Sequence, residues 1–417
     1  MKKKNVAIIG GGASGMMAAI SAARKGAKVS IYEKNDRIGK KILATGNGKC
    51  NFSNLYLDDS CYHGNDISKV MKILERFTPQ DCSSFFQEQG MIIKNRDGYL
   101  YPASEQASTV LDILRMQLSF WNVTIITECE IYDIKTEKNN GQTSYQIIGS
   151  CGGKKEHFVA DSVIFSCGSL AGIPMKKQKG YNAYDIFTKL NLPLVPLVPA
   201  LVQLRCKEEF MKAVAGVRAE GEVTLYINGQ EICKERGEVQ LTDYGVSGIP
   251  VFQLSRYASY ALKEQKSVQV ELNVLPFLTE EEFEKFCKNR HVLNKNQTVQ
   301  EYYLGICNKK LLLLYMKLAG IKSTDRIINI STEKRRRVFE YMRRLRLNVI
   351  ATNSFEQAQV CAGGLSMDAV DDNLQLKDYP GIYVTGELLD VDGRCGGYNL
   401  QWAFAGGYIA GCNAAEG

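Results

Sequence analysis

The segment from Asn5 to Lys34 restricts the possible folds of this 417-residue chain more than any other segment. Its apolar run at 6–9 predicts a buried strand, 16–25 has the composition of a helix, and 27–32 predicts a second strand. Gly10, Gly12 and Gly15 fill a G-x-G-x-x-G turn between the first strand and the helix, and Glu33 follows the second strand. This order of elements predicts a Rossmann-type unit that binds a dinucleotide, rather than a structural turn.

Each part of this segment has a physical role in such a unit. Gly10 permits the tight turn, Gly12 lets the backbone approach a pyrophosphate, and Gly15 lets the helix and the strand pack closely. The N-terminus of the helix offers N–H groups and the positive end of its dipole to phosphates. Glu33 is placed to hold a ribose diol.

The composition narrows the class of protein. With 45% hydrophobic and 23% charged residues the chain is an ordinary globular protein, and its length predicts two or three domains. Its net charge of +7 suits an anionic cofactor or substrate as well as nucleic acid. Thirteen cysteines without a C-x-x-C favour free thiols in a reducing cytosol and argue against a zinc site. No run approaches the ~18 apolar residues of a membrane span, so we expect a soluble, cytoplasmic protein without a bound metal.

The polar, glycine-rich segment 34–54 predicts a functional loop, because long loops that follow a nucleotide-binding strand tend to carry function. The alternative is a solvated surface loop. Its lysines can meet phosphates, and its hydroxyl and amide side chains can hydrogen-bond a polar ring or a ribityl chain. These residues are Lys40, Lys41, Lys49, Thr45, Asn47 and Asn51.

The middle of the chain predicts further organisation. Residues 161–168 read as a short apolar strand that ends on Gly168, and the proline-rich stretch 193–204 marks a domain boundary. Residues to about 274 favour β-structure, 278–346 favour helices, and 347–360 return to strands. The basic run 334–347 has apolar residues at helical spacing. We interpret it as a solvated helix face rather than a nucleic-acid or lipid surface.

The end of the chain predicts a second strand, turn and helix. Residues 381–385 form the strand, Gly386 and Glu387 the turn, and Gly396 and Gly397 precede a helix at 398–412. Two such helix N-termini predict one large cofactor gripped from both ends. The second helix would point its positive end at a flavin pyrimidine edge, which favours FAD over NAD.

Four stretches together resemble a bacterial family of three-domain NAD(P)/FAD-dependent oxidoreductases that includes bile-acid 3-dehydro-Δ4,6-reductases and aminoacetone oxidases. They are GGGASGMMAAI, GNGKCNFSN, GGLSMDAVD and TGELLDVDGRCGGYNLQWAFAGGYIAG, and the resemblance spans essentially the whole chain. It implies an α/β fold in which a discontinuous, Rossmann-like FAD-binding domain (1–192 and 361–417) carries an inserted β-rich domain (193–274 and 347–360). A helical domain (275–346) is inserted in turn.

The resemblance also implies the FAD contacts. Near the adenosine and pyrophosphate it places Gly10, Gly12, Ala13, Ser14, Gly15, Glu33 and Lys34. Along the middle and the ring it places Lys40, Lys41, Thr45, Gly46, Asn47 and Asn51. Ile131 would meet adenine through its backbone, with Gly168 beside it. Over the ribityl chain and the isoalloxazine it places Gly386, Glu387, Gly397, Tyr398, Asn399 and Leu400.

The proton donor is predicted less directly. The family's Thr-His-x-Gly is replaced here by Thr242, Asp243, Tyr244 and Gly245, and Cys395 stands where a threonine is usual. Tyr244 and Tyr398 are therefore the candidate donors, with Asp243 third. A tyrosine that only packs on the ring, or an aspartate that only caps a turn, is the structural alternative.

Three functions remain open from the sequence. We expect an NAD(P)H-dependent reductase of a conjugated C=C bond in an apolar, steroid-like or bile-acid-like ketone. The sequence has no second G-x-G-x-x-G for the nicotinamide nucleotide, which would therefore have to dock transiently. The alternative is a flavin amine oxidase that passes electrons to O₂ and releases peroxide. The third is an RNA-associated flavoprotein that uses the 334–346 face. The partner expected is a small-molecule substrate, with no nucleic acid.

Overall fold

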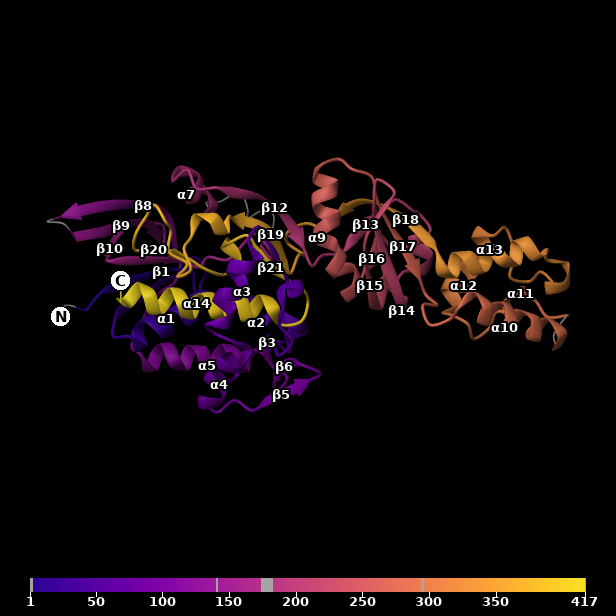
Figure 1. The fold of residues 1–417 in the computed structure, drawn as a ribbon, viewed down its shortest axis with the longest axis horizontal. Helices are drawn as coiled ribbons and strands as arrows, with labels where there is room; N and C mark the ends of the chain where they lie inside the picture. The colour runs from indigo at the N-terminus through magenta and orange to yellow at the C-terminus, as the bar shows by residue number, and fades with distance from the viewer. Residues whose placement is uncertain (1–2, 140–141, 174–182, 294–295, 417) are drawn as a thin grey trace. The chain divides into compact units, whose positions relative to one another are not determined.

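The computed structural model describes residues 3–139, 142–173, 183–293 and 296–416 (Figure 1). The chain divides into two compact units, of which the first comprises Met1–Val198 with Val360–Gly417 and the second Pro199–Gln359. The second unit is thus an insertion between two segments of the first.

The first unit is built on a five-stranded sheet with the strand order β20-β11-β1-β2-β7. All four pairings are parallel, and β1 lies between β11 and β2, with Val6 opposite both Ser162 and Val29. A parallel sheet is apolar on both faces, which explains the continuous apolar runs seen in the sequence. The strands are β1 (Asn5–Ile9), β2 (Lys28–Tyr32), β7 (Thr124–Ile126), β11 (Ser162–Phe165) and β20 (Ile382–Val384).

Helix α14 (Tyr398–Glu416) packs directly on α1 (Ala13–Arg24), side by side in Figure 1. Glycines make this close approach possible. A Cβ on Gly407 would lie 2.3 Å from the carbonyl oxygen of Ser14, and a Cβ on Gly411 would lie 2.3 Å from that of Ala18. The first and last helices of the unit therefore touch backbone to backbone.

Smaller elements surround this sheet. One antiparallel sheet consists of β8 (Cys129–Asn139), β9 (Gln142–Cys151) and β10 (Lys154–Ala160). A second small sheet has the order β3 (Ser53–Asn54), β6 (Tyr99–Pro102), β5 (Ile93–Arg96), with β6 in the middle. Two further sheets are strand pairs: β21 (Val391–Gly393) with β4 (Tyr62–Gly64), and β12 (Leu194–Ala200) with β19 (Val360–Leu365). The helices are α2 (Lys40–Leu43), α3 (Ile67–Glu75), α4 (Pro79–Glu88), α5 (Ala107–Phe120) and α7 (Ala183–Lys189).

Two expectations need correction in this unit. The alternating pattern of residues 122–134 predicts one strand, but the structure has two there, because β7 joins the parallel sheet while β8 turns away at Glu128, which has φ +53°. The expectation of free thiols is wrong for Cys129 and Cys151, which form a disulfide. They lie opposite each other in the antiparallel register of β8 and β9, a proximity that only the pairing creates. Ten further cysteines with described side chains are not assigned to a disulfide.

The second unit contains a closed barrel with the strand order β13-β16-β15-β14-β17-β18, and α9 (Ile249–Lys263) packs against it. The strands are β13 (Leu204–Cys206), β14 (Arg218–Ile227), β15 (Gln230–Leu241), β16 (Gly245–Ser247), β17 (Val268–Asn273) and β18 (Leu345–Thr352). The short helix α8 (Met211–Val214) precedes β14.

The segment 275–346 is helical, as its sequence predicts. It contains α10 (Glu280–Leu293), α11 (Val299–Tyr302), α12 (Lys309–Leu318) and α13 (Thr332–Arg343). The hydroxyl of Thr279 accepts the N–H of Glu282 at 3.2 Å and so caps α10, as the sequence indicates. Barrel residues such as Val270 and helix residues such as Tyr315 and Phe339 belong to one hydrophobic cluster. The separation of this segment as a third domain stays a prediction.

In the part of the chain that the structure describes, no helix combines the length and the apolar character needed to cross a bilayer.

The glycines between α14 and α1 give a stability prediction. Replacing a helical glycine by alanine ordinarily stabilises a helix by about 1 kcal/mol. Because the new methyl group would meet the Ala18 carbonyl, we expect Gly411→Ala instead to destabilise the protein by about 1–3 kcal/mol. Thermal unfolding should show a midpoint lower by several degrees, whereas Asn413→Ala in the same helix should leave it unchanged or slightly higher. An unchanged midpoint for Gly411→Ala would contradict the close packing.

Candidate dinucleotide-binding site

The turn between β1 and α1 has the steric constraints that its glycines predict. Gly10 has φ +105°, and a Cβ there would lie 2.6 Å from Cys167 Cα. A Cβ on Gly15 would lie 2.0 Å from the carbonyl oxygen of Gly10. At Gly12, by contrast, the nearest described atom outside the turn would be the carbonyl oxygen of Ser166, 3.9 Å from a Cβ. Gly10 and Gly15 are required by the fold itself, whereas a Cβ on Gly12 would make only an ordinary van der Waals contact, so the fold leaves room beside Gly12.

The N-terminus of α1 adjoins this room beside Gly12. Gly12 is its N-cap, and within the described chain no side chain caps it and no acidic residue occupies its first turn. The helix begins with Ala13 and Ser14, and Ser14 is buried. A helix N-terminus without a capping side chain suits an anion, because its first N–H groups and its dipole favour negative charge.

Glu33 lies beside the glycine turn, directly after β2. It is buried, and its carboxylate accepts the backbone N–H of Gly11 and that of Asn35, each at 2.8 Å. The side-chain amide of Asn35 donates a further bond to it. These bonds fix the carboxylate at the edge of the turn, in the place where a ribose diol is expected.

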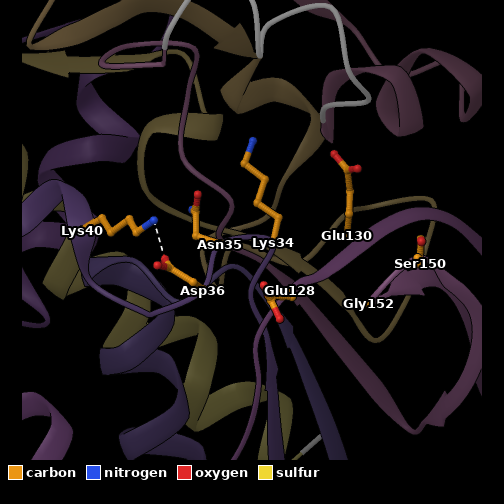
Figure 2. Close-up of a pocket in the computed structure, with 9 residues that line it drawn as sticks. Lys34, Asn35, Asp36, Lys40, Glu128, Glu130, Ser150 and Gly152 are labelled. Carbon is orange, nitrogen blue, oxygen red and sulfur yellow. Dashed lines mark ion pairs between the residues drawn. The ribbon is translucent and has the colours of Figure 1, made fainter.

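A polar pocket of about 510 Å³ opens beside Lys34 and Asn35, the two residues that follow Glu33 in the chain (Figure 2). Lys34 and Lys40 point into it, and Lys40 forms an ion pair with Asp36. Ile131, the predicted adenine contact, is buried in β8 directly after Glu130, and the strand register shifts between Ile131 and Asp133. No sequence motif pointed to the other pocket residues. Strands β8 and β9 and the turn between β9 and β10 bring them there, namely Glu128, Glu130, Ser150, Gly152 and Gly153.

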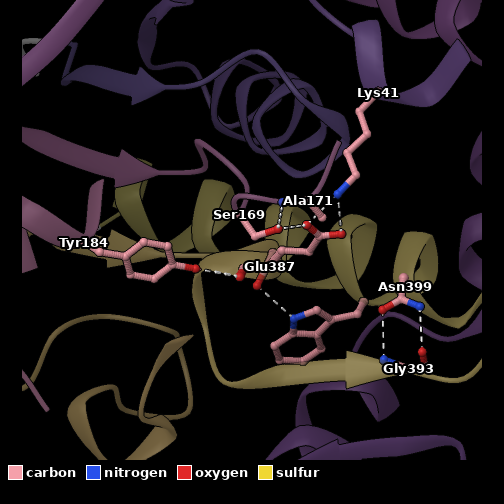
Figure 3. Close-up of polar contacts among 9 residues, drawn as sticks. Lys41, Ser169, Ala171, Tyr184, Glu387, Gly393 and Asn399 are labelled. Atoms are coloured by element: carbon pink, nitrogen blue, oxygen red, sulfur yellow. Dashed lines mark hydrogen bonds and ion pairs between the residues drawn. The ribbon is translucent and has the colours of Figure 1, made fainter. Parts of the chain in front are cut away.

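The predicted loop contact Lys41 meets the predicted C-terminal contact Glu387, 346 residues away (Figure 3). The Lys41 ammonium lies 2.7 and 2.8 Å from the two Glu387 carboxylate oxygens. Ser169 donates a hydrogen bond of 2.6 Å to the same carboxylate, and the Tyr184 hydroxyl donates one of 3.2 Å to the Glu387 backbone oxygen. The turn after β20 is thereby tied to α2 and to the segment that follows β11.

The remaining loop residues form a short turn. Thr45, Gly46 and Asn47 lie in the 3₁₀ helix at Thr45–Gly48, and the Thr45 hydroxyl donates to the Ile42 carbonyl at 2.6 Å. The Asn47 side chain lies outside the described atoms. The carboxamide oxygen of Asn51 is buried, and no described group donates a hydrogen bond to it. A buried acceptor in this state points to a donor that the chain itself does not supply.

This Asn51 oxygen lies next to the N-terminus of α14. A Cβ on Gly397 would be 2.7 Å from it and 2.5 Å from the carbonyl oxygen of Ser53. Asn399 donates to the Gly393 carbonyl at 2.8 Å and accepts the Gly393 N–H at 2.8 Å, so it closes the loop ahead of the helix (Figure 3). Leu400 is half-buried in the first turn of α14.

Three residues that the sequence interpretation missed hold this loop in place. Asn54 donates to the Gly396 carbonyl at 2.9 Å. Ser53 donates to Gln401 at 2.6 Å, and Gln401 in turn donates to the Phe77 carbonyl at 2.8 Å. Their position inside motifs already singled out, GNGKCNFSN and GGYNLQW, was the available signal.

Other predicted positions adjoin these two helix N-termini. Gly168 follows β11 with φ +71°, close to the glycine turn, and burial raises the pKa of the neighbouring Cys167 thiol to about 12. Gly386 has φ +71°, and a Cβ there would lie 2.7 Å from the Ser14 hydroxyl. The structure therefore brings the predicted N-terminal and C-terminal contacts into one site.

The candidate proton donors occupy different units. Tyr398 is buried in the first unit, where burial and then a hydrogen bond with Cys61 raise the pKa of its phenol. Asp243 and Tyr244 lie between β15 and β16 of the second unit. Asp243 is exposed, while the Tyr244 hydroxyl accepts a bond of 3.1 Å from Asn353 and its ring lies under Arg205. Their catalytic roles stay predictions.

The residues present fit a flavin dinucleotide. The room beside Gly12 would accept the pyrophosphate at the N-terminus of α1, and the polar pocket beside Lys34 and Asn35 would accept the adenosine. The buried oxygen of Asn51 lies where a hydrogen-bond donor on the ring or the ribityl chain would satisfy it. The fold and these features define a Rossmann-type dinucleotide-binding protein.

Comparison with known proteins places the chain in a family. It matches the HI0933-like protein Rossmann domain over residues 4–413. It is 39% identical over 414 residues to the 3-dehydro-bile acid delta(4,6)-reductase of Clostridium scindens, with 99% of each chain covered. The chain therefore belongs to the HI0933-like family, which confirms the resemblance inferred from its motifs and the expectation of an oxidoreductase.

More distant relatives widen the picture. The ribosomal RNA dihydrouridine synthases of Haemophilus influenzae and Escherichia coli are each 26% identical to the chain over 408 residues, and 96% of each relative is covered. Among solved structures, the 3-ketosteroid delta1-dehydrogenase of Sterolibacterium denitrificans superposes with a TM-score of 0.50 at 12% identity, with both chains covered completely. This likeness supports the fold.

Gly12 gives a test that separates binding from folding. We expect Gly12→Val to weaken FAD binding about 100-fold or more, because its side chain would occupy the pyrophosphate space and remove several charge-assisted hydrogen bonds. The apoprotein should lose at most about 1 kcal/mol of stability, the difference between glycine and a poor N-cap. Fluorescence titration of the apoprotein with FAD, together with thermal unfolding, measures both.

Gly15→Ala is the matched control, because its Cβ would collide with the Gly10 carbonyl and destabilise the apoprotein itself. A Gly12→Val protein that binds FAD as tightly as the wild type would show that the pyrophosphate does not lie at this turn.

Proposed function

We propose that this protein is an FAD-dependent reductase that saturates a C=C bond conjugated to a ketone in an apolar, steroid-like substrate. NADH or NADPH would be its electron donor. The observation that carries the proposal is the 39% identity, over essentially the whole of both chains, to a reductase named for such a reaction on bile acids. The glycine turn, the polar pocket beside Lys34 and the Asn51 acceptor support FAD as the dinucleotide.

Bound FAD would supply the hydride chemistry, because a flavin accepts hydride from a nicotinamide and passes it to an activated carbon. The chain's own residues would bind and orient the cofactor. The N-terminus of α1 would hold the pyrophosphate, and the N-terminus of α14, fixed by Asn399 and Asn54, would direct its positive end toward the ring. The pair of Lys41 and Glu387 would hold α2 against the turn after β20.

A proton must reach the carbon next to the one that receives hydride. Tyr398, Tyr244 and Asp243 remain the candidate donors. A tyrosine phenol is protonated at neutral pH, and the rise that burial causes in the pKa of Tyr398 keeps it so while making it a weaker acid. Its position in the first turn of α14 supports a role near the ring.

Anaerobic mixing with NADH or NADPH tests the electron donor. We expect rapid loss of the oxidised flavin absorbance with one of the two nucleotides, and reoxidation by an enone such as a 3-dehydro-Δ4,6 bile acid. Holoprotein mixed with buffer that contains neither nucleotide serves as the control. Bleaching by aminoacetone alone, with peroxide formed once air is admitted, would instead establish the amine oxidase.

A second candidate substrate is the uracil ring of ribosomal RNA. Two relatives at 26% identity are ribosomal RNA dihydrouridine synthases. The uracil C5=C6 bond is conjugated to the C4 carbonyl, so its reduction belongs to the same chemical class as that of an enone. With uridine as with a bile-acid enone, the flavin would thus have to deliver hydride to a carbon conjugated to a carbonyl group.

The charge distribution favours this candidate. Residues 299–346, which contain α11, α12 and α13, hold twelve basic residues (Lys and Arg) and four acidic ones (Asp and Glu). The rest of the chain holds forty basic and forty-one acidic residues. The whole positive excess is therefore concentrated in this segment, as is typical of nucleic-acid-binding proteins. Lys317, Lys322 and Lys334 are exposed, and Lys334 donates to the Gly320 carbonyl, which lies between the other two in the chain.

A reduction assay on RNA tests the second candidate. Unmodified ribosomal RNA transcripts, incubated with holoprotein and NADPH, should gain two hydrogen atoms at a uridine, detected by mass spectrometry of the nucleosides. The double variant Lys317→Glu/Lys334→Glu should lose retention on this RNA at ~0.1 M salt, because each lost phosphate contact lowers affinity and the salt slope. Its flavin spectrum should stay unchanged. Unmodified uridine and unaltered retention would exclude this substrate.

A further inference from the structure

Three cationic side chains converge on one carboxylate in the first unit. Lys94 and Arg96 come from β5, Lys49 follows the 3₁₀ turn of the candidate FAD loop, and all three form ion pairs with Glu105. The Lys94 ammonium lies 2.6 Å and the Lys49 ammonium 3.6 Å from Glu105 oxygens, and Arg96 approaches still more closely. Two segments of the chain thus contribute to one cationic cluster, defined here as Lys49, Lys94 and Arg96, and a third segment contributes its counter-ion Glu105.

The cationic cluster carries more charge than Glu105 balances. One carboxylate faces three cations, and about half of each cationic side chain is open to solvent. Exposed ion pairs of this kind contribute at most about 1 kcal/mol each, so stability alone does not explain three of them on one acceptor. Hydrogen bonds from Lys94 and Arg96 lower the pKa of Glu105 to about 2, so it is ionised at neutral pH.

The backbone at Glu105 is strained. Its φ of +53° lies in the left-handed region, which costs a residue with a side chain about 1–2 kcal/mol. The tight turn in which the Glu105 N–H bonds to the Pro102 carbonyl holds this conformation. Strain that persists outside a glycine often marks a functional position.

The cationic cluster adjoins the residues that shape the proposed ring site. Its strand β5 pairs with β6, and β6 pairs with β3, where Asn54 lies opposite Tyr99. Asn54 holds the Gly396 carbonyl, and a Cβ on Gly396 would lie 2.8 Å from the Tyr99 ring. The small β3–β6–β5 sheet therefore connects the cationic cluster to the loop ahead of α14.

Aromatic side chains accompany the cations. The Arg96 guanidinium lies 5.4 Å from the centre of the Tyr101 ring, while Tyr99 and Tyr56 are exposed. Cations beside exposed aromatic rings are the combination that binds nucleotides, in which phosphates meet the cations and bases stack on the rings.

We propose that Lys49, Lys94 and Arg96 form a binding site for a phosphate group of a nucleotide that approaches the flavin, and that Glu105 is the counter-ion which the phosphate displaces. The inference rests on the proposed function, since it names the contact by which a nucleotide without its own Rossmann turn would dock. The phosphate can come from the nicotinamide nucleotide or from an RNA substrate. An arginine fork with two lysines matches the geometry of phosphate oxygens.

Glu105 distinguishes this site from a structural salt-bridge cluster. A phosphate competitor and a structural tie predict opposite signs for Glu105→Gln. If the carboxylate occupies the site of the phosphate, its neutralisation leaves three cations without a counter-ion and strengthens phosphate binding. If Glu105 merely orders the cations, its loss disorders them and weakens binding.

The experiment compares two variants of the FAD-loaded protein. Isothermal titration with inorganic pyrophosphate should show about tenfold weaker binding for Lys94→Ala/Arg96→Ala, and several-fold tighter binding for Glu105→Gln at low salt. In anaerobic flavin reduction, the apparent dissociation constant for NADH or NADPH should rise in Lys94→Ala/Arg96→Ala and fall in Glu105→Gln. Lys25→Ala, which removes an equally exposed ion-pair cation beside Glu416, is the matched control and should change neither.

These measurements distinguish a phosphate of the nicotinamide nucleotide from a phosphate of RNA, and they distinguish a failure of the phosphate site from a failure of the proposed function. Altered dissociation constants for NADH or NADPH assign the phosphate to the electron donor, whereas altered retention on ribosomal RNA transcripts with unchanged nucleotide constants assigns it to RNA. If neither nucleotide reduces the wild-type flavin, the proposed donor fails while pyrophosphate titration still tests the site. Pyrophosphate binding that is unchanged in both variants, or weakened by Glu105→Gln with an unaltered thermal midpoint, overturns the proposal.

Discussion

The contact between α1 and α14 is the constraint on which the first unit depends. Gly407 and Gly411 let the last helix lie against the carbonyl oxygens of Ser14 and Ala18, closer than any side chain would allow. Because α1 begins at the glycine turn and α14 begins directly after Gly397, this contact sets the distance between the two helix N-termini. A dinucleotide that spans both ends can be held only when that distance is fixed.

Polar contacts also fix the positions of the loops around the two helix N-termini. Lys41 and Ser169 both bind Glu387, and Asn54 and Asn399 both close the loop ahead of α14. Each of these bonds joins segments that are distant in the chain or fixes a turn that no regular element supports. The loops of the site are therefore positioned by side chains rather than by strands, which suits a site that must close around a large cofactor.

The relatives of the chain act on chemically similar bonds in very different molecules. A bile-acid enone and a uracil ring both present a C=C bond conjugated to a carbonyl, so the two relatives are named for reductions of the same chemical class. Under the proposals made above, substrate choice would depend on surfaces away from the bond that is reduced. The basic segment 299–346 and the cationic cluster beside Glu105 are the two surfaces that these proposals assign to that role.

The sequence by itself determined the glycine turn, Glu33, the second helix N-terminus at Gly397 and the helical character of 275–346, because these depend on local backbone requirements and periodic patterns. It also determined the family, which follows from motifs at both ends. Only the tertiary structure decided that β8 and β9 bring Glu128 and Ser150 to the pocket, that Cys129 meets Cys151, and that Lys41 meets Glu387. Those contacts join residues far apart in the chain, and such proximity follows from strand register and helix packing, which no local pattern encodes.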